Sequence, residues 1–189
     1  MNRFARFAAS ALALSLVPAM LMGCGKKEAS TGSDLEYIKQ KGTLVVGITD
    51  FAPMDYQNES GEWIGFDADL AKAFAESLGV EVQFQTIEWD NKVMELDGKT
   101  IDVVWNGMTL TDDVKAAMST SKPYFNNAQV VIVRADRAAD IKTAADCKGL
   151  TFAVEKGSAG EAAATANGFK ITAVKDQATA LTEVKAGTS

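Results

Sequence analysis

The chain has 189 residues, a formal net charge of −6, two cysteines and no histidine. An acidic chain without a basic cluster argues against nucleic acid as a partner. Without histidine it lacks the commonest general base and metal ligand, so catalysis would rest on carboxylates or lysines, and we expect no cofactor or metal. The length suffices for one ordinary domain or two small lobes.

The N-terminus has the pattern of an export signal. Arg3 and Arg6 precede an apolar run over residues 7–22, which is too short to be read first as a membrane-spanning helix. The run ends in Leu-Met-Gly-Cys at residues 21–24, which resembles the lipobox of bacterial lipoproteins. An ordinary signal peptide with a chance cysteine is the alternative.

The lipobox interpretation predicts a lipid anchor. Residues 1–23 would be removed as the signal peptide, and Cys24 would carry diacylglycerol and a further acyl chain such as palmitate. Two or three acyl chains hold a protein firmly on a membrane without spanning it. Residues 24–33 are small and polar, so we expect a flexible tether there.

Strand-like and helix-like segments alternate after this tether. We expect strands at 43–48, 80–84, 101–105, 130–133, 150–154 and 169–174. Between and after them we expect a helix capped by Asp67 and ended by Gly79, and helices at 90–96, at 111–118, from Ser158 to about 168, and at 177–186. This alternation predicts the α/β class with largely parallel sheets. The last helix leads into no further strand, which is typical of an unfinished βαβ unit, so we expect a C-terminally truncated chain. Cys147 precedes a strand and is expected to be a buried structural thiol.

Four landmarks carry a resemblance to a known family. They are Gly-Ile-Thr-Asp-Phe-Ala-Pro at 47–53, Gly-Phe-Asp-Ala-Asp-Leu at 65–70, Ile-Asp-Val-Val-Trp-Asn-Gly-Met-Thr at 101–109, and Ser-Thr-Ser-Lys-Pro-Tyr at 119–124. In order and spacing they resemble the first lobe of the family 3 (polar amino acid) extracellular solute-binding proteins. The resemblance implies a two-lobed type 2 periplasmic-binding (Venus flytrap) fold, with lobe 1 at 34–124 and a hinge strand plus an incomplete lobe 2 at 125–189.

The resemblance also implies where a ligand would bind. Ligands of open α/β sheets sit at the carboxyl ends of strands, which is where Asp50 and Phe51 follow the first strand and Gly107 and Thr109 follow the third. Phe51 either stacks on the ligand or packs at a lobe edge, and the segment 106–109 either binds ligand or forms a simple strand-to-helix turn. The implied ligand-binding positions are Asp50, Phe51, Trp89, Asn106, Gly107, Met108, Thr109, Glu155, Ser158 and Ala159. Trp89 is equally well explained by packing between sheet and helix, and Ser158 by ordinary helix capping.

The sequence departs from the family at one position. Where the family typically places an arginine that grips the ligand carboxylate, this chain has Val114, and Lys115 would point roughly 100° around the helix. The helix start at Ser158 could partly replace that charge. Asp50 and Glu155 favour a ligand with positive charge.

Two functions follow from the resemblance. The first is the substrate-binding component of an ABC importer, which captures a polar or cationic amino acid outside the cytoplasmic membrane and delivers it to membrane permease subunits. The second is an enzyme of the cyclohexadienyl dehydratase type on the same fold, for which Asp50, Glu155 or Asp67 would be the acid or base. The lipid anchor and tether favour the importer, so we expect no enzyme activity.

Overall fold

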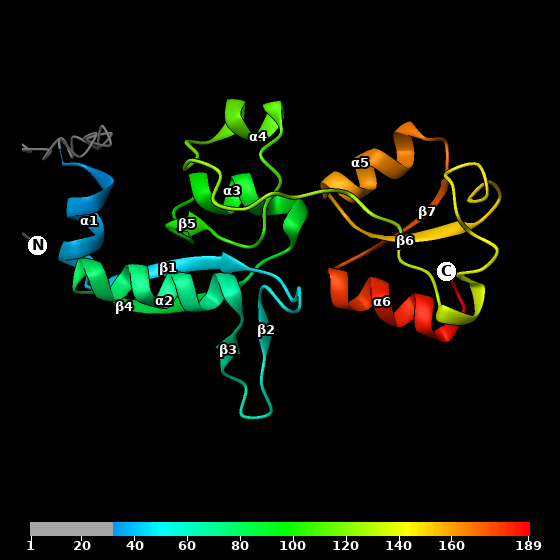
Figure 1. Ribbon diagram of the computed structural model, residues 1–189. Helices are drawn as coiled ribbons and strands as arrows, with labels where there is room; N and C mark the ends of the chain where they lie inside the picture. Colours follow the sequence, from blue (N-terminus) through cyan, green and yellow to red (C-terminus); the bar gives the residue numbers. More distant parts are fainter. Residues whose placement is uncertain (1–31) are drawn as a thin grey trace, which may run out of the picture. The chain divides into compact units, whose positions relative to one another are not determined.

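The computed structural model describes residues 32–189, so the expected signal peptide, Cys24 and most of the tether lie outside the described residues. The first sheet is built around β1 (Thr43–Ile48). This strand pairs in parallel with β4 (Glu81–Thr86) on one side and β5 (Val103–Val104) on the other, in the order β4-β1-β5 (Figure 1). Because all three strands are parallel, their carboxyl ends lie at the same edge of the sheet.

Alternate residues of β1 fill two cores. Leu44 and Val46 are fully buried against Ala71 and Ala75 of α2 (Phe66–Leu78), with α1 (Asp34–Lys41) contributing the buried Ile38. Val45 points the other way and packs with the cluster of Ile87, Trp89 and Ile101. This period of two, apolar on both faces, is what a central parallel strand requires.

Short elements complete this part of the chain. They are the antiparallel hairpin β2 (Tyr56–Gln57) and β3 (Trp63–Ile64), the 3₁₀ turn η1 (Trp89–Asn91), α3 (Lys92–Asp97) and α4 (Asp112–Ala117). Thr111 caps α4 by accepting a hydrogen bond from the Val114 N–H at 3.2 Å. Ser33 and Glu36 form a capping box at the start of α1. This helix was not among the elements predicted from the sequence.

A second parallel sheet follows. It pairs β6 (Thr151–Glu155) with β7 (Lys170–Val174), and α5 (Ala159–Ala166) and α6 (Gln177–Ala186) pack against it (Figure 1). A 3₁₀ turn, η2 (Ala135–Arg137), lies in the segment that precedes β6. The α/β class with largely parallel sheets is confirmed, and Cys147 is buried as expected.

Two expectations about single elements are wrong. Residues 130–133 form no strand, and Val130, Val131 and Ile132 are exposed, because no described strand lies beside them to receive their backbone hydrogen bonds. Asp67 does not cap α2. The helix begins at Phe66 after Gly65, and the Asp67 carboxylate is engaged elsewhere. The lobe boundary between residues 124 and 125 stays a prediction.

Gly65 provides a test of how tightly α2 is seated. Its φ is +118°, and a Cβ there would lie 2.4 Å from the Met54 carbonyl oxygen. We expect Gly65→Ala to lower the free energy of unfolding by about 3 kcal/mol, because the new methyl group would clash with backbone atoms that cannot move aside without distorting the turn. Gly61→Ala is the matched control: its φ is +79° but nothing lies within 4 Å, so it should cost only about 1 kcal/mol. Urea unfolding of both variants measures the difference, and equal losses would contradict the steric explanation.

Asp55 is a buried acid whose two carboxyl oxygens have no hydrogen-bond partner among the described residues. Burial, and then the negative charge of Asp67, raise the pKa of Asp55 to about 8, while the nearby backbone N–H of Ala68, which does not meet hydrogen-bond geometry, opposes the rise. The folded protein therefore holds a proton that the unfolded chain gives up above the ordinary aspartate pKa of 3.8. Stability from this group is greatest at low pH and falls as pH rises towards 8.

We therefore expect the free energy of unfolding to fall between about pH 4 and pH 8, with a contribution of at most about 1.4 kcal/mol per pH unit from Asp55. Asp55→Asn removes the titrating group and should flatten this dependence. Urea unfolding of both proteins at pH 5, 6, 7 and 8 measures it. Parallel pH profiles for the two proteins would show that Asp55 is not the group responsible.

Candidate functional site

Polar side chains meet where β1, β5 and β6 end. Thr49 follows β1, Asn106 follows β5, and Glu155 is the last residue of β6. The Thr49 N–H donates to Asn106 Oδ1 at 3.1 Å, and Asn106 Nδ2 donates back to Thr49 Oγ1 at 2.7 Å. The Thr49 hydroxyl in turn donates to Glu155 Oε1 at 2.9 Å. One hydroxyl thereby joins the carboxyl ends of strands from two different sheets.

Glu155 is the centre of this cluster. Its other carboxyl oxygen, Oε2, accepts a hydrogen bond from Gln177 Nε2, at the start of α6, at 3.3 Å. Only 3 % of the residue is exposed. Burial raises the pKa of Glu155 to about 7, although the hydrogen bonds from Thr49 and Gln177 oppose the rise.

Asp67 ties a second group of residues together. Its carboxylate is fully buried and accepts hydrogen bonds from the Gly107 N–H at 2.7 Å and from the Tyr124 hydroxyl at 2.6 Å. The Phe51 ring lies directly beside Gly107, since a Cβ at that glycine would come within 3.0 Å of the ring. Asp67 thus joins three of the four sequence landmarks, those at 65–70, 101–109 and 119–124. It also fixes the Gly107 backbone, beside which the Phe51 ring lies.

The remaining predicted residues divide into two sets. Asp50 lies half-buried beside α6, where its carbonyl accepts from the Ala178 N–H at 3.3 Å; burial, and then the charge of Asp176, raise the pKa of Asp50. Ser158 caps α5, which begins at Ala159, by accepting from the Glu161 N–H at 3.1 Å. Trp89, in contrast, belongs to the apolar cluster behind β1, as its packing alternative has it, and only 6 % of it is exposed. Met108 packs against the same cluster.

Lys115 lies one residue after the position where the family typically places a carboxylate-binding arginine. Its side chain is half-exposed and pairs with Asp112 at 3.6 Å, on the surface of α4. Thr109 Oγ1 accepts from Asn127 Nδ2 at 2.8 Å and from Gln129 Nε2 at 3.3 Å. Its hydroxyl hydrogen therefore remains able to donate to a carboxylate.

Three residues at this site escaped sequence reasoning: Thr49, Gln177 and Lys92. Lys92 Nζ donates to the carbonyls of Trp89 and Gly157, at 3.1 Å each, and burial lowers its pKa. The positions of Thr49 and Gln177 in the sequence could have indicated a site, because Thr49 directly follows a strand and Gln177 is the first residue of a helix. Lys92 gave none, because its partner Gly157 lies 65 residues away.

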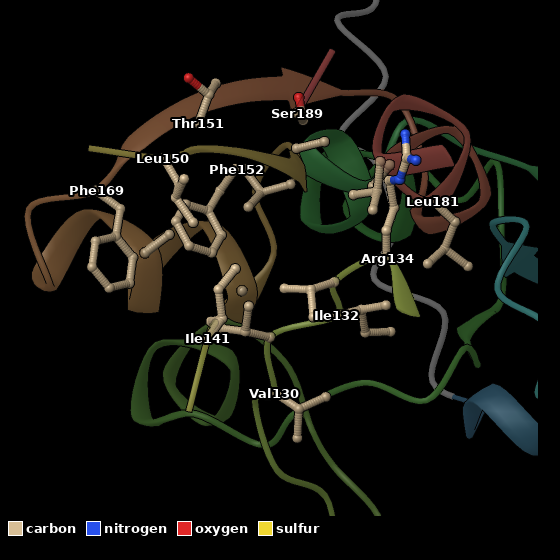
Figure 2. A pocket seen from close by; sticks show the side chains of 18 of the residues that line it. Val130, Ile132, Arg134, Ile141, Leu150, Thr151, Phe152, Phe169, Leu181 and Ser189 are labelled. Carbon is tan, nitrogen blue, oxygen red and sulfur yellow. The ribbon is translucent and has the colours of Figure 1, made fainter. Parts of the chain in front are cut away.

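A cavity of about 770 Å³ lies beside β6 (Figure 2). Much of its wall is apolar, with Phe152 and Phe169 stacked at 4.7 Å between ring centroids. At the carboxyl end of β6 the lining changes to Gln129, Glu155, Ser158 and Gln177. Glu155 and Ser158, two of the predicted ligand-binding residues, thus line this polar end, while Arg134, Asp136 and Arg137 line the cavity elsewhere.

Within residues 32–189, no three acidic or cysteine side chains converge to hold a metal ion. No helix in the same range is long and apolar enough to cross a membrane.

The chain is similar to known amino acid-binding proteins. The chain is 32 % identical over 157 residues to the L-cystine-binding protein TcyJ of Escherichia coli (strain K12), covering 82 % of this chain and 59 % of TcyJ. It therefore spans about three-fifths of the length of that relative. Among solved structures, the ancestral amino acid-binding protein AncCDT-1, a precursor of cyclohexadienyl dehydratase, is 36 % identical with a TM-score of 0.79, covering 83 % of this chain and 71 % of that one.

A second solved structure, the P235GK mutant of ArgBP from T. maritima, is 36 % identical with a TM-score of 0.77 and covers 83 % of this chain and 69 % of that one. These likenesses give the chain the type 2 periplasmic-binding fold. The sequence model of the bacterial extracellular solute-binding proteins, family 3, matches residues 44–187. The chain belongs to that family.

Proposed function

We propose that this protein is the substrate-binding component of an ABC importer and that it captures a polar or cationic amino acid outside the cytoplasmic membrane. The observation that carries the proposal is the meeting of Thr49, Asn106 and Glu155 from the ends of β1, β5 and β6. Such a point, where strand ends from two sheets converge, is where open α/β folds bind small ligands. The cystine- and arginine-binding names of similar proteins support an amino acid as the ligand.

The proposed binding set has complementary chemistry for an amino acid. Asp50 and Glu155 are acidic and suit the cationic groups of the ligand. Thr109 and the backbone N–H groups at the start of α5 are hydrogen-bond donors for its carboxylate. Phe51, beside Gly107, offers a ring face for the ligand side chain. Delivery to membrane permease subunits follows from the importer role and is part of the proposal.

A second candidate is an enzyme that dehydrates a cyclohexadienyl acid. It is favoured by the likeness to AncCDT-1 and by the buried carboxyl of Glu155, which could act as an acid. Conversion of such an acid by the purified protein, followed by ultraviolet absorbance, would establish this alternative and displace the importer proposal.

Thermal-shift binding against a panel of amino acids tests the importer proposal. A ligand present at 100 times its Kd stabilises the folded protein by about 2.7 kcal/mol. We expect Thr49→Val to weaken binding about tenfold or more, because it removes the hydroxyl between Asn106 and Glu155 while keeping the side-chain shape. Thr86→Val is the matched control, since Thr86 is exposed at the end of the adjacent β4 and should leave affinity unchanged. Equal affinities of both variants would contradict the proposed site.

Lipid anchoring at Cys24 is a further part of the proposal. In cells fed a labelled fatty acid, the protein should take up label and sediment with membranes, because acylation supplies the anchor. Cys24→Ala should abolish both, whereas Cys147→Ala should abolish neither, since Cys147 is a buried thiol. Labelling that survives Cys24→Ala would refute the lipobox interpretation.

A further inference from the structure

Glu155 is a buried carboxyl that forms no salt bridge within the part of the chain the structure describes. Both of its hydrogen bonds come from neutral donors, the Thr49 hydroxyl at 2.9 Å and the Gln177 amide at 3.3 Å. A carboxylate has about four acceptor positions, so two remain open. Because Glu155 also lines the polar end of the cavity, a bound solute could reach them.

The charged groups around Glu155 do not balance it. Lys92 is the cation that acts on it, but the Lys92 ammonium donates to the carbonyls of Trp89 and Gly157. Asp176, just before α6, adds negative charge, and Asp50, after β1, lies beside the same helix. On α5, the Glu161 carboxylate adds a further negative charge, and its Oε2 accepts a hydrogen bond from the Gly157 N–H at 2.7 Å. The surroundings therefore favour either a neutral Glu155 or an added positive charge.

We infer that Glu155 selects solutes with a cationic side chain and gives up a proton when such a solute binds. The inference rests on the proposed function and names the class of ligand that the site prefers. When the site is empty, the proton on the carboxyl avoids an unpaired buried charge. When a cationic side chain arrives, the proton leaves to the solvent and the carboxylate forms an ion pair with the solute. A neutral solute brings no charge and leaves the proton in place.

The pH dependence follows from the position of this equilibrium. With its pKa raised to about 7 by burial, Glu155 is about half protonated at pH 7 in the empty site. Cation binding needs the ionised form, so affinity rises with pH through 7 and levels off above it. Between pH 6 and pH 8 the expected gain is about tenfold, and at pH 7 binding should release about half a proton.

L-Arginine and L-citrulline are matched probes, because they have similar shapes and only arginine carries a positive side chain. Isothermal titration of the full chain at pH 6, 7 and 8, in two buffers of different ionisation enthalpy, gives both affinity and proton release. We expect the arginine-to-citrulline affinity ratio to rise about tenfold from pH 6 to pH 8. Proton release should accompany arginine and not citrulline.

Glu155→Gln should remove both the rise in this ratio and the proton release. Glu161→Gln is the control, because it deletes a nearby charge from α5 and should keep both. If Glu155→Gln fails to fold, the two-buffer titration of Asp50→Asn distinguishes the two acids: release that this variant keeps supports Glu155, and release that it abolishes overturns the inference. Amino-acid binding without pH dependence or proton release would overturn the inference and leave the proposed function intact. Release that persists in Glu155→Gln would assign the proton to another group, Asp50 first. Failure of every amino acid to bind would instead overturn the proposed function.

Discussion

The parallel pairing of β1 with β4 and β5 is the constraint on which the rest of the structure depends. It buries Leu44 and Val46 on one face and Val45 on the other, so the strand is held by two cores. It also places the ends of β1 and β5 side by side, which allows Thr49 and Asn106 to exchange two hydrogen bonds. The pairing of Thr49 with Asn106 is therefore a consequence of strand direction.

Three buried acids in this protein show how environment decides what a carboxyl does. Asp67 accepts two hydrogen bonds and serves as a rigid connector. Asp55 has no hydrogen-bond partner within residues 32–189, and burial raises its pKa to about 8. Glu155 lies between these cases, with two neutral donors and an open side towards the cavity. Of the three, only Glu155 is among the residues that line the cavity, and buried acids with raised pKa values beside a cavity are typical of functional sites.

The sequence predicted those elements whose signals are local. Residues 43–48 and 177–186 form the expected strand and helix, because apolar runs and caps act within a few positions. Residues 130–133 have equally strong strand propensity but form none, since a strand also needs a neighbour. Asp67 looked like a cap because the residue type suits caps, yet its partners, 40 and 57 residues away, were invisible to local reasoning. Within the site, Glu155 could be found from its family position, whereas Lys92 could not, and ligand contact remains a prediction for every residue named.

The way α2 begins has a mechanical consequence. The N–H groups of Phe66 and Asp67, which open the helix, donate to the carbonyls of Pro53 and Met54 at 3.2 and 3.0 Å. These two hydrogen bonds join the turn that carries Phe51 to the start of α2. On α2, Phe66, Leu70 and Phe74 follow one another at intervals of four residues, and all three are exposed. The turn that carries Phe51 and this exposed apolar stripe are therefore joined through the same helix start.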